Sequence, residues 1–343
     1  MKKINAGIVG GTSLLAGLLI EILYTHPYVD LIYIDSEHHP NEPIYKFHRF
    51  LKCDIKNKKF DNYSKEFVHK NLDVIFIAKP HRISMKYVKD LYNEKIKIID
   101  LSGDFRIKNV KEYEKWYNTK HIIPDLIKKS VYGLSEVYTE KIKKANLIAN
   151  PGCYPTGILL ALYPLLKNRI IDSKSIFIVS YSGVSGAGKN PVPGKNLFID
   201  AFNNIIAYKV TAHQHIPEIE EYLSEFAENR VMINFVPHIT SVEDGIFNTI
   251  FLKPEKSLAE KEFFKFYEEC YKNCKFIKIN RERIPEIKDV VDTNFCNISL
   301  KMDIRTGNLI VFSVIDNRIK GGVGQAVQNM NLMFDLPEDT GLM

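Results

Sequence analysis

Short apolar runs alternate with helix-length segments through the first third of the chain, and this alternation restricts the fold most. Segments 14–23 and 84–92 have helical periodicity, and turns rich in Gly, Pro and Ser follow the runs. The runs themselves cover residues 4–9, 29–34, 74–78 and 96–101. Apolar strands joined by helices are typical of a parallel sheet covered on both faces. We therefore predict an α/β fold with an N-terminal doubly wound, Rossmann-like domain, whose ligand lies at the carboxyl ends of the strands.

The chain of 343 residues is long enough for a second domain. Beyond Asn150, alternating strand patterns and two helical segments predict an α+β domain. Its expected strands are 176–180, 208–210, 231–237, 247–252, 297–302 and 309–314, and its expected helices are 218–227 and 258–272. A last helix, 326–334, has an apolar face that should return to the first domain. The predicted domains are 1–149 together with about 323–343, and 150–322.

The charge and cysteine content argue against several classes of protein. The net charge of +6 comes from lysines spread among acids, so no basic face indicates nucleic acid. Every apolar stretch is shorter than a membrane span, and we expect a cytoplasmic protein. Five cysteines, an odd number at low density, fit a reducing compartment. Cys270 and Cys274 lack a matching pair of Cys or His, so we predict no metal site.

A glycine turn separates the first strand from the first helix. Its residues, Gly10, Gly11, Thr12 and Ser13, stand where backbone amides at a helix N-terminus bind phosphate. The spacing departs from the usual dinucleotide fingerprint, and many glycine turns bind nothing. Asp35 follows the second strand, where a carboxylate accepts a hydrogen bond from a ribose 2′-hydroxyl and repels a 2′-phosphate, which favours NAD. An acidic residue in a solvated turn is an equally good interpretation.

One cysteine, Cys153, lies on a turn between the apolar run 147–149 and a helical pattern that begins at Thr156. Unpaired amides and the positive end of the helix dipole favour a thiolate over a thiol there, which makes the sulfur nucleophilic. Gly152 and a nearby proline flank it, in place of an apolar stripe. Cys153 is therefore a candidate nucleophile, and a small buried thiol is the alternative.

Two histidines and one arginine follow turns or strand ends. His213 and His215 lie two residues apart and share a face if their segment is extended. One imidazole beside the nucleophile is enough for acid–base catalysis, whereas a metal needs a third ligand for which the sequence offers no strong candidate. Arg106 follows the fourth strand, where it can bind a phosphate or carboxylate, or pair with Asp104 on the surface.

Five separated segments resemble the N-acetyl-gamma-glutamyl-phosphate reductase family of the aspartate-semialdehyde dehydrogenase superfamily, in the family's order and over nearly the whole chain. They are residues 100–106, 150–156, 182–188, 213–218 and 316–334. The resemblance implies NADPH-dependent reduction of N-acetyl-gamma-glutamyl phosphate to the semialdehyde in arginine biosynthesis, through a cysteine thioester. It also implies a homo-oligomer, a dimer or tetramer, joined through the second domain's sheet. Alternatives are the same chemistry on aspartyl phosphate or on a carrier-bound aminoadipyl or glutamyl phosphate, and a regulator without catalysis.

The resemblance implies a role for each matching residue. Cys153 is the nucleophile and His215 is the acid–base partner, while the first domain binds the dinucleotide and the second is catalytic. The implied substrate-binding residues are Arg106, Asn150, His213 and Glu218. The implied cofactor-binding residues are Gly10, Thr12, Ser13, Leu14, Ser36, Ser185, Gly186 and Asn317. Loop 181–189 and the glycine turn together suggest that one extended anion is held from both domains.

Three departures from the family pattern bear on these expectations. Ser13 and Ala16 replace glycines, which predicts a tighter phosphate loop, and Gln214 replaces an arginine between the histidines. The acidic turn 35–37 replaces Thr-Ser-Arg, which weakens the expected hold on a 2′-phosphate.

The acidic turn and the resemblance therefore favour different cofactors, NAD and NADPH. Like charges a few ångströms apart are unfavourable unless a cation intervenes, and lysines or arginines elsewhere in the chain, such as Lys46 or Arg82, are candidates for that cation. We predict NADPH, with NAD as the alternative, because the resemblance spans the chain and the turn is only three residues long. The preference over NADH should be weaker than is usual in the family.

Overall fold

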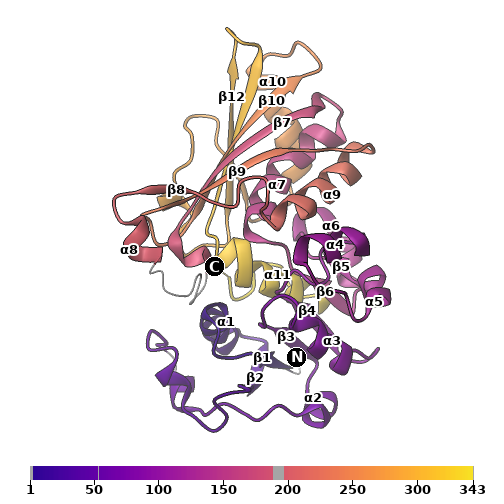
Figure 1. Ribbon diagram of the computed structural model, residues 1–343, viewed down its shortest axis with the longest axis vertical. Helices are drawn as coiled ribbons and strands as arrows, with labels where there is room; N and C mark the ends of the chain where they lie inside the picture. Colours follow the sequence, from indigo (N-terminus) through magenta and orange to yellow (C-terminus); the bar gives the residue numbers. More distant parts are fainter. Residues whose placement is uncertain (1–2, 53, 188–196, 343) are drawn as a thin grey trace. The chain divides into compact units, whose positions relative to one another are not determined.

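The computed structural model describes residues 3–52, 54–187 and 197–342. The chain divides into two compact units, each with its own sheet (Figure 1). Unit 1 comprises Met1–Pro151 and Gly322–Met343, and unit 2 comprises Gly152–Gly321. Among the described residues, we find no helix with the length and apolar content needed to cross a bilayer.

Unit 1 contains a six-stranded sheet in the order β2-β1-β3-β4-β6-β5, with every strand parallel to its neighbours. The strands are β1 Ile4–Val9, β2 Val29–Ile34, β3 Val74–Ile77, β4 Lys97–Asp100, β5 Val131–Tyr132 and β6 Leu147–Ala149. The strand order reverses between β1 and β3. Ligands of doubly wound sheets bind in the crevice that such a reversal opens at the carboxyl ends.

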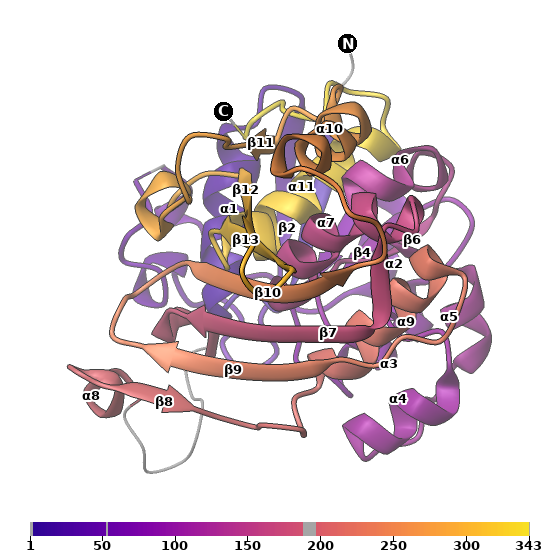
Figure 2. The same cartoon turned by 90° about the horizontal axis from the view of Figure 1, so that it is seen from above.

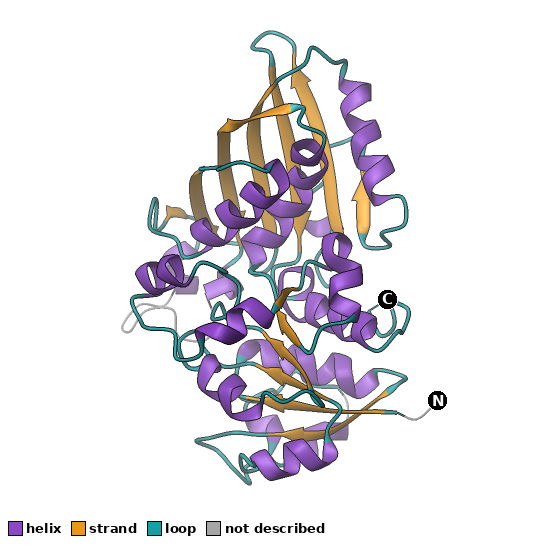
Figure 3. Cartoon of the chain, turned by 90° about the vertical axis from the view of Figure 1, so that its right-hand side faces the viewer, coloured by secondary structure: helices purple, strands orange, loops and turns teal. Residues whose placement is uncertain are grey.

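Helices cover both faces of the unit 1 sheet (Figure 3). On one face, Ile75 and Ile77 belong to one apolar cluster with Val88 of α3, and on the opposite face Val74 and Phe76 are equally buried. The helices are α1 Leu14–Thr25, α2 Lys65–Asn71, α3 Ser84–Leu91, α4 Val110–Tyr117, α5 Pro124–Lys129, α6 Ser135–Lys143 and α11 Gly324–Met333. Helix α11 packs on α6 and β4, which confirms the predicted return of the last helix.

Unit 2 contains a seven-stranded mixed sheet in the order β11-β12-β13-β10-β7-β9-β8. Its strands are β7 Ile171–Ser182, β8 Ile205–Ala207, β9 Asn234–Thr240, β10 Ile246–Pro254, β11 Ile277–Ile279, β12 Cys296–Asp303 and β13 Asn308–Ile315. Its helices are α7 Cys153–Lys167, α8 Leu197–Ala201, α9 His215–Ala227 and α10 Glu260–Tyr271. Helices α7, α9 and α10 lie on one face (Figure 2). The predicted α/β and α+β architectures of the two domains are therefore confirmed.

The strand predicted at 208–210 is wrong. Strand β8 ends at Ala207, and the backbone then turns, because Lys209 and Thr211 have φ angles of 45° and 63°. These left-handed conformations cannot belong to a strand. The histidine segment is not extended either, since His215 is the first residue of α9. The two imidazole rings are nevertheless neighbours, with their centres 4.8 Å apart.

Candidate active site

The candidate nucleophile, Cys153, is the first residue of α7 and is half-buried. Gly152 precedes it as the N-cap residue and donates its N–H to Oε1 of Glu218 at 2.8 Å. The Gly152 carbonyl accepts hydrogen bonds from the amide and the hydroxyl of Thr156, at 3.0 and 2.9 Å. Cys153 thus lies at the helix N-terminus that the sequence predicted, and a buried carboxylate on α9 ties this turn in place.

The loop after β13 comes close to Cys153 from another direction. A Cβ added to Gly321 would lie 2.8 Å from the Cβ of Cys153, so no larger residue fits there without a shift. The Gly321 amide donates to the carbonyl of Asp316 at 2.8 Å. Backbone on two sides therefore fixes the position from which the sulfur projects.

The two histidines lie beside this turn. The amide of His215 donates to Nδ1 of His213 at 3.1 Å, which leaves the ring proton of His213 on Nε2. Burial, with a smaller contribution from Lys209, lowers the pKa of His213 to about 3. The ring of Tyr154, the residue after Cys153, lies 5.4 Å from the His213 ring and 5.9 Å from the His215 ring. His213 is therefore a neutral imidazole in a ring cluster next to the cysteine.

Two tyrosines complete the surroundings of the thiol. The hydroxyl of Tyr208 donates to that of Tyr154 at 3.0 Å; Tyr154 is buried and Tyr208 is half-buried. Burial raises the pKa of both phenols, and the negative charge of a Cys153 thiolate raises each further. Both phenols therefore keep their protons near the sulfur. Sequence reasoning missed this pair, although Tyr154 directly follows the cysteine.

Arg106 is buried in unit 1. Its Nε donates to the carbonyl of Asn150 at 2.6 Å and its Nη2 to the carbonyl of Leu101 at 2.8 Å. The surface pair with Asp104 is wrong, because Asp104 is itself buried and accepts a hydrogen bond from the hydroxyl of Tyr113 at 2.7 Å. Substrate binding by Arg106 stays a prediction.

Asn150 and Glu218, predicted to bind substrate, also have internal partners. The amide nitrogen of Asn150 donates to the carbonyl of Gly322 at 3.0 Å, and its oxygen accepts from Asn329 at 3.1 Å. Glu218 is completely buried and holds the amide of Gly152. These contacts give both side chains a positioning role whether or not a substrate also reaches them.

Three predicted cofactor residues of unit 2 lie together. The amide nitrogen of Asn317 donates to the hydroxyl of Ser185 at 2.9 Å, and its oxygen accepts from the Gly245 amide at 2.6 Å. A Cβ added to Gly186 would lie 3.5 Å from that amide nitrogen. The end of the same loop, Gly188 and Lys189, lies outside the described residues.

The glycine turn of unit 1 is built around Asp35. Oδ1 of Asp35 accepts a hydrogen bond from the Gly10 amide at 2.6 Å, and its backbone carbonyl accepts one from Gly11 at 2.8 Å. Gly10 has φ +90°, and a Cβ there would lie 2.7 Å from the carbonyl oxygen of Ala78. Asp35 is fully buried, so its interpretation as part of a solvated turn is wrong. Burial raises the pKa of Asp35 to about 6.

Gly10→Ala is expected to destabilise unit 1 and to weaken dinucleotide binding. A left-handed non-glycine residue costs about 1–3 kcal/mol, and the methyl group would also press on Ala78. Gly307→Ala is the matched control, because φ is +73° there but a Cβ meets nothing within 4 Å. Urea unfolding of both variants should show a larger loss for Gly10→Ala, with reduced cofactor affinity for that variant alone. Equal losses of stability in the two variants would argue against a close approach between Gly10 and the backbone of Ala78.

Asp35→Asn is expected to change how stability depends on pH. Because the folded-state pKa of Asp35 is raised, the native wild type loses stability as pH rises from about 4 to about 6. The loss is about 3 kcal/mol at about 1.4 kcal/mol per pKa unit, and asparagine cannot show it. The variant's unfolding free energy relative to wild type should therefore be higher at pH 8 than at pH 4. A difference independent of pH would contradict the raised pKa.

The predicted cofactor residues near α1 divide into two groups. Gly10, Thr12 and Ser13 line a cavity of about 970 Å³ in unit 1, and Leu14 and Ser36 are not among its lining residues. Ser13 is the N-cap of α1, and its hydroxyl accepts from the Ala16 amide at 3.1 Å. Its replacement of glycine thus stabilises the start of the helix. Ser36 is buried and its hydroxyl accepts from the amide of His39 at 3.2 Å.

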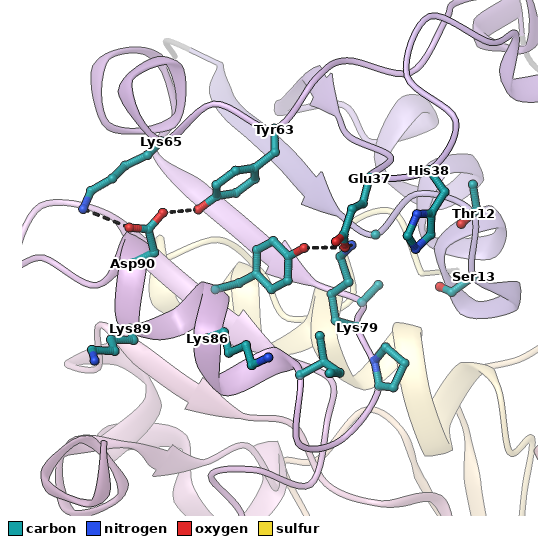
Figure 4. A pocket seen from close by; sticks show the side chains of 15 residues that line it. Thr12, Ser13, Glu37, His38, Tyr63, Lys65, Lys79, Lys86, Lys89 and Asp90 are labelled. Carbon is teal, nitrogen blue, oxygen red and sulfur yellow. Dashed lines mark hydrogen bonds and ion pairs between the residues drawn. The ribbon is translucent and has the colours of Figure 1, made fainter. Parts of the chain in front are cut away.

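The other wall of this cavity carries lysines that sequence reasoning missed (Figure 4). Lys79 follows β3, Lys86 and Lys89 lie on α3, and Lys65 lies on α2. The expectation of a cation from Lys46 or Arg82 is wrong for this cavity, because neither residue lines it. The spacing of the two α3 lysines, three residues apart on a crossover helix, was the available signal.

The described residues contain no group of three or more His, Cys, Asp or Glu side chains placed to hold a metal ion. Unit 1 thus contains a doubly wound sheet, and unit 2 contains a cysteine at a helix start whose neighbour Tyr154 contacts two histidine rings. Both units match the semialdehyde dehydrogenase class of proteins. Residues 5–145 match the family model described as "Semialdehyde dehydrogenase, NAD binding domain". Residues 153–317 match the one described as "Semialdehyde dehydrogenase, dimerisation domain".

Sequence comparison with curated relatives identifies the family within this class. The chain is 42% identical to N-acetyl-gamma-glutamyl-phosphate reductases of Halothermothrix orenii and Campylobacter jejuni, over 99% of this chain and 98% of each relative. It is 40% identical to that of Clostridium novyi over the same shares. The chain therefore belongs to the N-acetyl-gamma-glutamyl-phosphate reductase family. The predicted resemblance is confirmed, and the chain is an oxidoreductase.

Solved structures share the two-domain fold. Aspartate semialdehyde dehydrogenase II of Vibrio cholerae, complexed with ASA, matches with a TM-score of 0.72 at 17% identity, covering 98% of this chain and 99% of that one. The enzyme of Candida albicans, solved with NADP, matches with a TM-score of 0.68 at 13% identity, covering 97% and 99%. At these identities the likeness is one of fold.

Proposed function

We propose that the chain reduces N-acetyl-gamma-glutamyl phosphate to N-acetylglutamate semialdehyde with NADPH and releases inorganic phosphate. The observation that carries the proposal is Cys153 as the first residue of α7, with the rings of His213 and His215 packed on the adjacent Tyr154, in a member of this family. In this proposal, unit 1 binds the dinucleotide and unit 2 holds the reacting groups.

The residues of unit 1 fit a dinucleotide. The missing Cβ at Gly10 keeps the backbone open beside Ala78, and the amides at the start of α1 are suited to bind phosphate, as helix N-termini are. Thr12 and Ser13 line a cavity of about 970 Å³ at this point. NADPH, when bound, supplies the hydride. Ser185, Gly186 and Asn317 form the cluster that would hold its nicotinamide side.

Cys153 performs the covalent step. Its thiolate attacks the acyl carbon, the bond from that carbon to the phosphate oxygen breaks, and a thioester forms as phosphate leaves. Reduction of the thioester carbon places negative charge on its oxygen, and His215 donates a proton there. His215 takes that proton back as the carbonyl re-forms, the carbon–sulfur bond breaks, and the thiolate of Cys153 returns.

Glu218 positions this machinery. Its carboxylate lies on α9, three residues after the helix start at His215, and holds the Gly152 amide next to Cys153. The same contact therefore couples the helix that carries the nucleophile to the helix that carries the acid–base group. His213, held neutral by burial, fits a hydrogen-bonding role toward an uncharged part of the substrate.

The chain is proposed to form a homo-oligomer through the open face of the unit 2 sheet and to act in the cytoplasm. Phe177 and Phe251 are paired across β7 and β10 on this face, with 50% and 39% of their surfaces exposed. Large exposed aromatic side chains on a sheet face are typical of protein interfaces. None of the four cysteines that the structure describes takes part in a disulfide.

A panel of acyl phosphates tests the proposal. The purified chain is mixed with N-acetyl-gamma-glutamyl phosphate, aspartyl phosphate or a carrier-bound acyl phosphate, and with NADPH or NADH. We expect phosphate release equal to cofactor oxidation, with the highest kcat/KM for N-acetyl-gamma-glutamyl phosphate. A higher value for another acyl phosphate would reassign the substrate, and binding of cofactor without turnover of any would indicate a regulator.

A further inference from the structure

The cavity of unit 1 carries more positive charge than its own acids neutralise. Its lining includes four lysines and two acids, Glu37 and Asp90. Oε2 of Glu37 lies 3.2 Å from Nζ of Lys79, and Asp90 lies 3.1 Å from Nζ of Lys65. Each acid is therefore paired, and an excess of two positive charges remains on the lining.

Both acids also accept hydrogen bonds from tyrosines. The Tyr87 hydroxyl donates to Glu37 at 2.8 Å, and the ammonium of Lys79 lies over the Tyr87 ring at 4.7 Å from its centre. The hydrogen bond from Tyr87, followed by Lys79, lowers the pKa of Glu37. Glu37 thus lies in a compact group with two partners, which reduces its repulsion of an incoming anion.

The remaining positive charge lies on α3. Lys86 and Lys89 have no acidic partner in the described part of the chain, and both line the cavity. Figure 4 shows Lys86 reaching toward the side of the cavity that holds Lys79, whereas Lys89 is directed the opposite way. Lys86 is therefore the unpaired cation that faces the group formed by Glu37, Lys79 and Tyr87.

The Asp35 carboxylate is not exposed to an anion in this cavity. Its side chain is fully buried, is turned to the Gly10 amide, and is not among the lining residues. Of the two acids in turn 35–37, Asp35 thus lies outside the cavity lining and Glu37 is paired with Lys79. The apparent conflict between this turn and a phosphorylated ribose is resolved by where the side chains lie.

A dinucleotide offers two kinds of phosphate to such a cavity. The amides at the start of α1, next to Thr12 and Ser13, suit the pyrophosphate, and they need no lysine. His38 and Glu37 lie beyond them, after β2, where doubly wound folds place the adenosine ribose. We propose that Lys86 selects a 2′-phosphorylated adenosine ribose, while Lys79 and Tyr87 mask Glu37. This inference rests on the proposed use of NADPH and assigns the residue that recognises it.

Two nucleotides that differ only in the 2′-phosphate test this assignment. Calorimetry measures the binding of adenosine 2′,5′-bisphosphate and of adenosine 5′-monophosphate to the full chain. The Kd of the monophosphate divided by the Kd of the bisphosphate is the ratio that reports recognition of the 2′-phosphate. Lys86→Gln is expected to reduce this ratio about tenfold, or about 1.4 kcal/mol, and to leave monophosphate binding within about twofold. Retained monophosphate binding also reports that the cavity is folded.

Matched variants separate a direct contact from a general loss of charge. Lys89→Gln removes the same charge from the same helix, and Lys70→Gln removes an exposed charge from α2 outside the lining. Both should change the ratio by less than about threefold, as expected for screened surface charges. Glu37→Gln should increase the ratio, because it releases Lys79. The assignment is overturned if Lys89→Gln has the larger effect, or if Lys86→Gln changes both affinities equally or neither.

Failure of this inference is distinguishable from failure of the proposed function. Wild-type chain is assayed for phosphate release from N-acetyl-gamma-glutamyl phosphate at saturating reduced cofactor. Turnover together with a ratio that is insensitive to Lys86 would overturn only the assignment of Lys86. A ratio that falls in Lys86→Gln, in a chain that reduces no acyl phosphate, would support the assignment and overturn the proposed reaction.

Discussion

Replacement of Cys153 by serine is expected to abolish acyl-phosphate reduction while leaving the fold and cofactor affinity intact. A serine hydroxyl is a much poorer nucleophile than a thiolate, and the difference in volume is small. The contacts that hold this turn, from Glu218 to Gly152 and from Gly321 to Cys153, involve backbone or Cβ atoms that serine retains. The rate should fall by more than about 10³-fold, since each factor of ten corresponds to about 1.4 kcal/mol of barrier.

The measurement is phosphate release, with cofactor binding followed by fluorescence. Cys270→Ser is the control, because Cys270 is also half-buried but lies on α10, and burial raises the pKa of its thiol. That variant should keep wild-type turnover. If Cys153→Ser kept activity within about tenfold of wild type, its barrier would have risen by less than about 1.4 kcal/mol. That result would show that Cys153 is not the nucleophile of the covalent step.

The strands of unit 1 could be predicted because nothing competes with the apolar pattern there. Buried parallel strands have apolar residues on both faces, so 4–9 and 29–34 in the sequence coincide with β1 and β2. The segment at 208–210 failed for the opposite reason. Tyr208 and Val210 favour strands by propensity, but the left-handed Lys209 and Thr211 impose a turn that the sequence does not announce.

The position of Cys153 could also be predicted, because Gly and Pro before an apolar helical pattern indicate a helix start. The partners of charged residues could not. Asp35 is buried on the amide of Gly10, 25 residues earlier in the chain, and Glu37 pairs with Lys79, 42 residues later. Arg106 is buried on backbone carbonyls, which carry no signal in the sequence. Lysines are spread evenly along the chain, so only the fold reveals which of them line one cavity.

The second large effect concerns the two histidines, to which the resemblance assigns different roles. His215→Ala is expected to lower kcat by roughly 10²- to 10⁴-fold and to flatten the dependence of kcat on pH, as expected for a lost acid–base group. Free imidazole should restore part of the activity if the missing group is a proton carrier. Unchanged pH dependence with a normal kcat would exclude His215 from proton transfer.

His213→Ala is the comparison that makes this prediction specific. Because burial lowers the pKa of His213 to about 3, its imidazole stays neutral from about pH 5 upward and cannot produce a titration near neutrality. Its Nδ1 already accepts the amide of His215, so its loss should loosen the start of α9 and raise KM while the pH profile keeps its shape. If His213→Ala instead lowered kcat more than His215→Ala and removed the pH dependence, the two roles would be reversed.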